Sequence, residues 1–341
     1  MSKFLFIRFS AIGDVAMSVP VIYSFAVQYP EHEITVLSKS SLASLFAEKP
    51  ANVSFFGVDV NHYKGIAGLN KLYKELKAMQ FDYVADLHNV IRTKYLGFRF
   101  KLDGIPVSRI FKNRIGKRKL VRRFHKELVN QKSSFRRYED TLKELGFPMQ
   151  LNFTSIYGDS KGDLSLIKNI TGDKGGMKWL GIAPFAKHKG KIYPIEMQEK
   201  VVAYFAGRDD VKVFLFGSGK EEEDIFNSWI RKYPSLVSVI GKLKMNTELI
   251  LMSHLNVMLS MDSANMHLAS LVNTPVVSVW GATHPYCGFM GWKQSPMNAV
   301  QVDLPCRPCS IFGQKKCYRK DYACLNMITP EMIIHRIEAN F

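Results

Sequence analysis

The chain has 341 residues, which is enough for about two domains of ordinary size. Hydrophobic residues make up 47% and charged residues 23%, so disordered, collagen-like and coiled-coil classes are excluded. The 47 lysines and arginines exceed the 30 acids, giving a formal net charge of +17. Such a surplus indicates an anionic partner, for example a nucleic acid, an anionic membrane surface or a phosphorylated substrate.

The first half of the chain alternates predicted strands with predicted helices. A β-prone run at 3–9 ends in a glycine turn, and an amphipathic stretch follows at 15–28. Helical periodicity recurs at 66–79. Three further strands are expected at 33–37, 53–56 and 83–86. This alternation predicts a parallel sheet covered by helices on both faces.

A strongly basic segment follows. Residues 92–126 hold thirteen lysines and arginines and a single acid, Asp103, with phenylalanines between them. We expect this segment to contact an anionic ligand or surface, with Arg118 and Arg122 among the contacting residues, and its phenylalanines to dip into lipid. The alternative is a solvated loop without a ligand.

The α/β alternation restarts after a linker predicted at 159–177. Strands are expected at 179–183, 211–216, 236–240, 257–261 and 275–280. Helices are expected at 195–206, 221–232, 247–253 and 263–271. Thr329 followed by Pro330 predicts the start of a last helix.

No part of the sequence is suited to cross a membrane or to act as a signal peptide. The longest uncharged run, 263–292, is interrupted by Asn265, His267 and prolines. Arg8 and Asp14 interrupt the apolar run near the N-terminus. We therefore expect a cytoplasmic protein.

The turn after the first strand is a candidate site. Ser10 to Val15 lies where open α/β sheets place their ligand crevice. Gly13 allows a tight turn, and Asp14 is expected to project into the crevice. The alternative is that Asp14 only caps the following helix.

A second strand-to-helix turn occurs at residues 259–267. Asp262, Ser263 and Ala264 open the predicted helix, and His267 follows about one turn later. Backbone N–H groups at a helix start, together with the helix dipole, favour a diphosphate. His267 could add a donor or could be a packing residue.

A third turn, residues 216–223, lacks the third glycine of the dinucleotide fingerprint because Glu222 stands in its place. Glu222 could accept from ribose hydroxyls or complement the helix start. The sequence has neither a phosphate-cradling P-loop nor an Asp-x-Asp metal clamp. We therefore expect the positive charge for a diphosphate to come from lysines such as Lys191.

Four of the five cysteines gather near the C-terminus. Cys306, Cys309, Cys317 and Cys324 begin with zinc-like spacing, but the second pair is six residues apart. A packed reduced cluster, a structural zinc and a disulfide all stay open. We expect no metal and no cofactor in the reaction itself.

The motifs together resemble a known family. The runs 6–20, 261–269 and 275–283 resemble the signatures of the family 9 glycosyltransferases, the lipopolysaccharide heptosyltransferases. The block 306–330 resembles the ending of many members. In this chain Tyr193 stands where the family's Lys-x-Trp-Pro motif has tryptophan.

The resemblance implies an α/β GT-B fold, with two Rossmann-like domains whose parallel sheets face each other across a cleft. It assigns 1–160 to the acceptor, 161–328 to the nucleotide-sugar, and 329–341 to a helix crossing back to the first domain. It further implies metal-independent inversion at the anomeric carbon. The expected partners are a nucleotide-sugar donor such as ADP-heptose and an anionic lipid-linked saccharide acceptor at the cytoplasmic face of the inner membrane. We expect a monomer that is peripherally associated and does not bind nucleic acid.

The resemblance also assigns roles. Asp14 matches the general base and Lys191 the lysine facing the diphosphate, while Ser10 and Gly13 lie on the acceptor side. The donor-binding residues implied by the motifs are Glu222, Asp262, Ser263, Ala264, His267 and Gly281. Two other functions, a basic nucleic-acid-binding protein and a dinucleotide-dependent α/β enzyme, stay open at this point.

Overall fold

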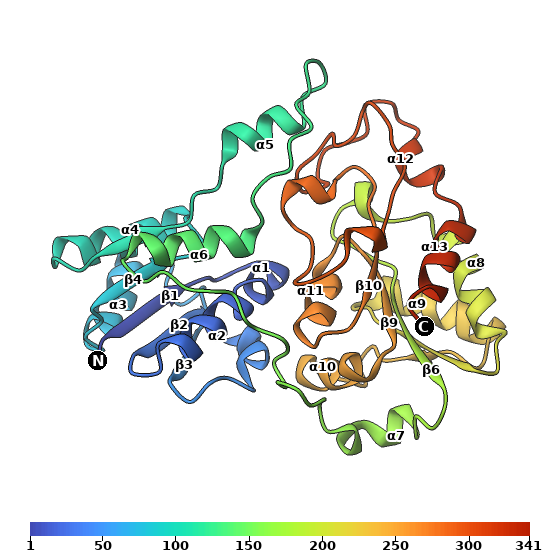
Figure 1. Cartoon of the computed structure of the whole chain (residues 1–341), viewed down its shortest axis with the longest axis horizontal. Helices are drawn as coiled ribbons and strands as arrows, with labels where there is room; N and C mark the ends of the chain where they lie inside the picture. The colour runs from blue at the N-terminus through green and yellow to red at the C-terminus, as the bar shows by residue number, and fades with distance from the viewer. The chain divides into compact units, whose positions relative to one another are not determined.

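The computed structural model describes residues 1–341, which divide into two compact units (Figure 1). The first unit comprises Met1–Lys112 and Lys132–Ile156, and the second comprises Asn113–Gln131 and Tyr157–Phe341. Residues 113–131, which we call the basic arm, therefore fold with the second unit although the expected boundary placed them in 1–160. No helix combines the length and the apolar character needed to cross a membrane.

The first unit is built on a five-stranded parallel sheet with the order β3-β2-β1-β4-β5. Its strands are β1 (Lys3–Ile7), β2 (Glu33–Lys39), β3 (Val53–Val58), β4 (Tyr83–Asp86) and β5 (Val107–Arg109). The four strands expected in this half are confirmed. The sequence analysis missed β5, because three residues ending in Arg109 are too short to show a periodicity.

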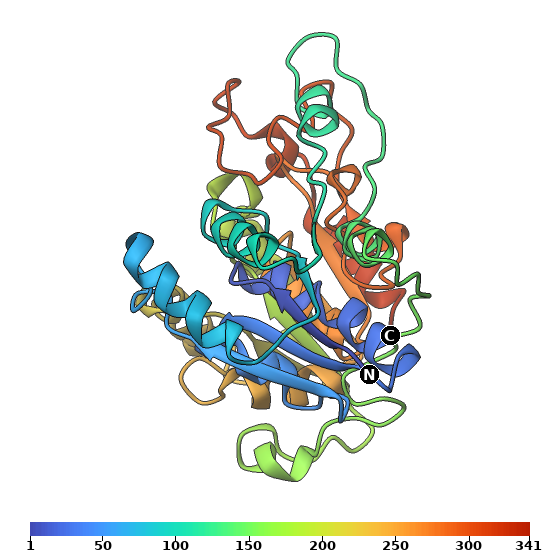
Figure 2. The same cartoon turned by 90° about the vertical axis from the view of Figure 1, so that its left-hand side faces the viewer.

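Helices lie on both faces of this sheet (Figure 2). They are α1 (Ile12–Ala16), α2 (Val19–Gln28), α3 (Gly65–Lys77), α4 (Ile91–Leu102) and α6 (Ser134–Glu144), with a 3-10 helix η1 (Ser40–Phe46). The single helix expected at 15–28 is two helices. Pro20 lies in the first turn of α2, where its missing N–H is tolerated, so the chain restarts there instead of continuing α1.

Alternate residues of β1 supply the core on the two faces. Leu5 and Ile7 pack with residues of α3 and α4. Phe6 points to the other face, where its ring centroid lies 5.4 Å from that of Phe25 of α2. Because successive strand side chains point to opposite faces, a continuous apolar run was the correct indicator of a strand covered on both sides.

The second unit contains a six-stranded parallel sheet with the order β11-β10-β9-β6-β7-β8. Its strands are β6 (Lys178–Ala183), β7 (Val211–Leu215), β8 (Val237–Ser238), β9 (Val257–Met261), β10 (Val276–Val279) and β11 (Ala299–Val300). The five expected strands are confirmed, although β8 is shorter than expected, and β11 was missed.

The helices of the second unit include one from the basic arm. They are α5 (Arg114–Leu120), α7 (Lys168–Thr171), α8 (Ile195–Ala206), α9 (Lys220–Lys232), α10 (Met245–His254), α11 (Ala264–Leu271), α12 (Ala323–Asn326) and α13 (Pro330–Glu338). Short 3-10 helices are η2 (Leu164–Ile167), η3 (Lys189–Lys191), η4 (Pro285–Cys287) and η5 (Pro296–Asn298). The expected cap is present, since the hydroxyl of Thr329 accepts from the N–H of Met332. α13 packs against α8, β10 and β11.

Candidate functional site

Each sheet has a point at which the strand order reverses direction. In the first unit the chain runs outward from β1 to β3 and then returns to β4, on the other side of β1. In the second unit it runs outward from β6 to β8 and returns to β9, on the other side of β6. Neighbouring loops leave the sheet in opposite directions at such a point, and the crevice between them is where open α/β sheets bind ligands.

Asp14 lies at this point of the first unit. A carboxylate oxygen of Asp14 is 2.8 Å from a guanidinium nitrogen of Arg8 and accepts from the N–H of Ala11 at 3.2 Å. Its side chain stays 33% exposed, whereas that of Arg8 is only 8% exposed. The carboxylate is thus held in place from the protein side and open on the other, as a proton acceptor for a bound ligand requires. Ser10 lies in the preceding loop and Gly13 within α1.

Arg8 is itself fixed by the loop after β4. Its guanidinium donates to the carbonyl of Leu87 at 2.7 Å, and the Tyr138 hydroxyl donates to the carbonyl of Asp14 at 3.2 Å. Burial disfavours the charge of Arg8, but Tyr138 and Asp14 outweigh it and raise the pKa of Arg8 above its usual value. Sequence reasoning missed Arg8 as a site residue, although an arginine ending an apolar strand immediately before the glycine turn was a usable signal.

His88 is a second residue that the sequence analysis missed. It follows β4, and its Nδ1 lies 3.4 Å from the backbone nitrogen of Phe9. Burial, followed by the positive charge of Arg8, lowers the pKa of His88 to about 3. The imidazole is therefore neutral at physiological pH and adds no charge beside Asp14.

This shift predicts that His88 makes the protein sensitive to acid. The pKa of His88 in the folded protein lies below the usual 6.5, so between pH 6.5 and 3 the unfolded chain binds a proton that the folded chain does not. The contribution of neutral His88 to the free energy of unfolding is therefore complete above pH 6.5 and is lost as the pH falls toward 3. The free energy of unfolding should fall by up to about 1.4 kcal/mol per pH unit from this group. We expect His88→Asn to flatten that slope in urea titrations between pH 6.5 and 4. Equal slopes in the wild type and the variant would contradict the shift.

The switch point of the second unit brings together Lys191 and Asp262. Lys191 is in η3, in the loop after β6, and Asp262 directly follows β9. The Lys191 ammonium is 2.9 Å from a carboxylate oxygen of Asp262, which also accepts from the Thr283 hydroxyl at 2.7 Å. The side chain of Asp262 is 4% exposed and that of Lys191 is 15% exposed. Asp262 thus holds the ammonium in position at the switch point of the second sheet.

The first turn of α11 lies immediately beside this pair. Ser263 is the residue before the helix, and no side chain caps the helix start. Its first-turn N–H groups, including that of Ala264, therefore form a partial positive charge suited to an anion. His267 lies one turn further along and is buried.

Glu222 and Gly281, two of the expected donor-binding residues, both make close contacts within the second unit itself. Glu222 folds back on its own helix start and accepts from the N–H of Ser218 at 2.8 Å, while burial raises its pKa above the usual value. A Cβ on Gly281 would lie 2.6 Å from the carbonyl oxygen of Gly190, so only glycine fits there. Both follow strands of the second sheet at their carboxyl ends.

Arg307, another residue that the sequence analysis missed, fixes the loop around Gly281. Its guanidinium donates to the carbonyls of Gly281 at 2.6 Å and of Trp280 and Thr283 at 3.0 Å. Since Thr283 in turn binds Asp262, Arg307 supports the Lys191–Asp262 pair from behind.

Tyr193, which stands in place of the motif tryptophan, is a core residue. It is fully buried, and its hydroxyl donates to the carbonyl of Ile328 at 2.8 Å. The aromatic position after Lys191 therefore anchors the loop to the segment that precedes α13.

The clustered cysteines surround a small cavity of about 10 Å³. All five cysteines of the chain are free thiols, and no group of three His, Cys, Asp or Glu side chains is arranged to hold a metal ion. Burial raises the pKa of Cys324 to about 12, so this thiol stays protonated at neutral pH.

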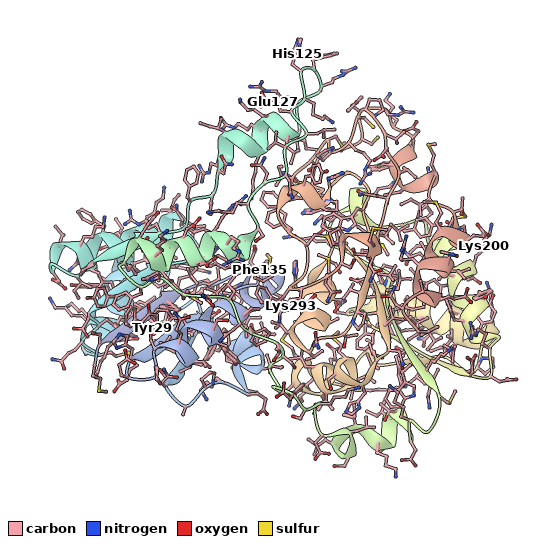
Figure 3. The ribbon with its side chains drawn as sticks, in the orientation of Figure 1. Tyr29, His125, Glu127, Phe135, Lys200 and Lys293 are labelled. Atoms are coloured by element: carbon pink, nitrogen blue, oxygen red, sulfur yellow. The ribbon has the colours of Figure 1, made fainter.

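Arg118 and Arg122 belong to the basic arm and thus to the second unit. Arg118 lies in α5 and Arg122 in the turn that follows, and both are exposed. Figure 3 labels His125 and Glu127 on the same turn.

Solved structures resemble this fold along nearly its whole length. A glycosyl transferase family 9 protein from Veillonella parvula superposes with a TM-score of 0.74 at 18% identity, covering 99% of this chain and 97% of that one. The E. coli ADP-heptose lps heptosyltransferase II superposes with a TM-score of 0.71 at 17% identity, covering 99% and 98%. The fold is therefore the GT-B fold of these glycosyltransferases, as the sequence analysis expected.

The sequence establishes the family. The profile of Glycosyltransferase family 9 (heptosyltransferase) matches residues 69–318. The chain belongs to this family, and it is a glycosyltransferase. Lipopolysaccharide heptosyltransferase 3 of Escherichia coli is 23% identical over 300 residues, covering 85% of each chain. The lipopolysaccharide core heptosyltransferase OpsX of Haemophilus influenzae is 24% identical over 292 residues, covering 82% of this chain and 79% of its own.

Proposed function

We propose that this glycosyltransferase moves a heptose from a nucleoside diphosphate donor, such as ADP-heptose, to the core of a lipopolysaccharide or lipooligosaccharide acceptor. The observation that carries the proposal is the Lys191–Asp262 pair beside the uncapped start of α11, at the switch point of the second sheet. The named relatives of this chain are lipopolysaccharide heptosyltransferases, and this supports the same donor and acceptor classes here.

The donor side of the reaction is assigned to the second unit. The N–H groups of Ser263 and Ala264 and the ammonium of Lys191 bind the diphosphate, and His267 adds a donor to it. As the glycosidic bond of the donor breaks, negative charge grows on the leaving diphosphate, and fixed positive groups stabilise that charge most. Asp262 acts through Lys191 as a positioning residue, while Glu222 and the loop at Gly281 shape the nucleoside pocket.

The acceptor side is assigned to the first unit. Asp14 accepts the proton of the acceptor hydroxyl as its oxygen attacks the anomeric carbon, in a single displacement that inverts the configuration. Arg8 keeps Asp14 in place, and the loop of Ser10 and Gly13 lies against the acceptor. Two observations support this role: the Asp14 carboxylate is paired with the buried Arg8, and one third of the Asp14 side chain is exposed to solvent.

A single displacement stabilised by protein cations has two measurable consequences. Saturating chelator should leave kcat unchanged, and NMR of the product should show the anomeric configuration opposite to that of the donor. Full dependence on added divalent cation would show that a metal manages the diphosphate. A retained configuration would require a covalent or front-face mechanism instead.

We further propose that the protein works at the cytoplasmic face of the inner membrane, as a peripheral protein. The basic arm exposes Ile115, Phe124, Leu128 and Val129 among its cations, a combination typical of interfacial binding. Phe124→Ser with Leu128→Ser should reduce co-sedimentation with phosphatidylglycerol vesicles severalfold. The paired change Leu166→Ser and Met297→Ser, at exposed apolar residues elsewhere in the same unit, serves as the control. Equal binding by both variants would overturn the interfacial role.

A further inference from the structure

The basic arm is tied to the cysteine-rich loop, which we define as residues 306–324. The Lys126 ammonium donates to the carbonyl of Pro308 at 3.0 Å. The guanidinium carbon of Arg123 lies 4.7 Å from the centre of the Tyr318 ring. The arm is also fixed at its end, where the N–H of Gln131 donates to the carbonyl of Tyr286 at 2.9 Å. Two segments far apart in the sequence thus form one surface within the second unit.

An open hollow of about 440 Å³ lies between the arm and this loop. Its charged lining consists of cations alone, three from the arm and two from the loop: Arg118, Arg122, Arg123, Lys315 and Lys316. The volume is in the range of sites that bind small molecules. It exceeds what a single phosphate or chloride ion requires.

The charges of the hollow are not neutralised by the protein. The nearby acid of the arm, Glu127, is paired with Lys119 at 3.1 Å. The nearby acid of the loop, Asp321, is paired with Arg319 at 2.9 Å. Five like charges gathered without a carboxylate repel one another, and a bound anion relieves that repulsion.

The kinds of side chain indicate which anion fits. Guanidinium groups bind phosphate through two parallel hydrogen bonds, and lysines add point charges. Five cations from two segments in a hollow this size match a ligand that carries more than one phosphate group. The exposed ring of Tyr318 offers an apolar face of the kind on which a sugar ring packs.

The loop also reaches the proposed donor site. Gly313 lies against the Lys191 side chain so closely that a Cβ there would be 2.7 Å from the Lys191 Cγ. Lys315 and Lys316 follow in the same loop. A ligand in the hollow would therefore bind the same loop whose Gly313 packs against Lys191, the residue proposed to face the donor diphosphate.

We propose that this hollow binds a saccharide carrying two or more phosphate groups. Its identification as the phosphorylated part of the acceptor rests on the proposed function. A phospholipid headgroup offers the same phosphate chemistry, and the experiment separates the two sources.

The test uses the full chain and a charge-neutralising triple variant, Arg118→Gln, Arg122→Gln and Lys316→Gln. Arg123 is kept so that its contact with Tyr318 survives. The matched control removes three exposed lysines of the same unit, Lys200→Gln, Lys242→Gln and Lys293→Gln; Lys200 and Lys293 are labelled in Figure 3. Calorimetry with a soluble sugar bisphosphate, fructose 1,6-bisphosphate, should show at least about tenfold weaker binding for the triple variant only, since one charge-assisted hydrogen bond alone is worth that much.

A site-resolved readout comes from Cys306, which lines the hollow. The sugar bisphosphate should slow alkylation of Cys306 by iodoacetamide in the wild type and the control but not in the triple variant, with the buried Cys287 as internal reference. Absence of binding and protection in the wild type, or equal losses in both variants, would overturn the proposal. So would binding to phosphatidylglycerol vesicles without binding to the sugar bisphosphate, which would identify a lipid headgroup as the ligand.

Neither binding nor protection requires turnover, so both can succeed where sugar transfer fails. With an active transfer assay, the triple variant should raise the KM of a phosphorylated acceptor and leave that of the donor unchanged. It should not alter the KM of the same acceptor after phosphatase treatment. A shift that persists after phosphatase treatment would contradict phosphate recognition.

Discussion

Asp14→Asn should lower kcat by at least about 10²-fold while donor binding stays intact, because Asn keeps the shape of the side chain but cannot accept the proton of the acceptor hydroxyl. General bases contribute about 10² to 10⁴ in rate, so the loss should persist at saturating acceptor. The measurement is kcat at saturating concentrations of both substrates, with donor affinity followed by calorimetry.

The ion pair with Arg8 has to be separated from catalysis in this experiment. Removing the Asp14 charge leaves a guanidinium that is 8% exposed without its carboxylate, which we expect to cost about 1–3 kcal/mol of stability. Tm and kcat of the folded protein are therefore measured together. Asp82→Asn is the control, since Asp82 accepts a backbone hydrogen bond from Lys3 at the opposite end of the sheet. Near-normal kcat in folded Asp14→Asn would refute the general-base role.

Lys191→Met should lower kcat by about 10² to 10³-fold, because the ammonium faces charge that develops only as the donor bond breaks. Donor affinity should fall by less than kcat. The variant should also be less stable by about 3–5 kcal/mol, since it leaves the 4% exposed carboxylate of Asp262 without its cation.

A double variant separates the two effects. Adding Asp262→Asn to Lys191→Met removes the uncompensated charge, so the double variant should regain most of the lost Tm. It should not regain kcat, because no positive group replaces the ammonium. Recovery of kcat together with Tm would show that Lys191 acts through stability alone and does not touch the diphosphate.

The sequence analysis predicted the strands and helices well where the periodicity was long or the apolar run continuous. The bounds of β4, β9 and α8 agree with the predicted ranges. The glycine turns were also placed correctly at the carboxyl ends of their strands, because a small residue followed by a helix pattern is a local signal. Candidate residues such as Asp14 and Asp262 could therefore be selected from the sequence.

The supporting residues could not be selected in this way, because their contacts join segments far apart in the chain. Arg8 binds the carbonyl of Leu87, and Arg307 binds the loop at Gly281. Asp262 was expected to bind the donor directly, whereas its carboxylate is occupied by Lys191 and Thr283. No spacing rule relates such partners, and only the folded chain brings them together.

The chain passes from one unit to the other three times: after Lys112, after Gln131 and after Ile156. A recombinant chimaera that joins residues 1–156 of one family member to the remainder of another would therefore combine the arm of the first protein with the cysteine-rich loop of the second. The contacts of Lys126 with Pro308 and of Arg123 with Tyr318 would then be made by residues that had not been selected together. If the arm binds the acceptor as proposed, an exchange of acceptor specificity between relatives should succeed only when residues 113–131 are transferred together with the C-terminal half.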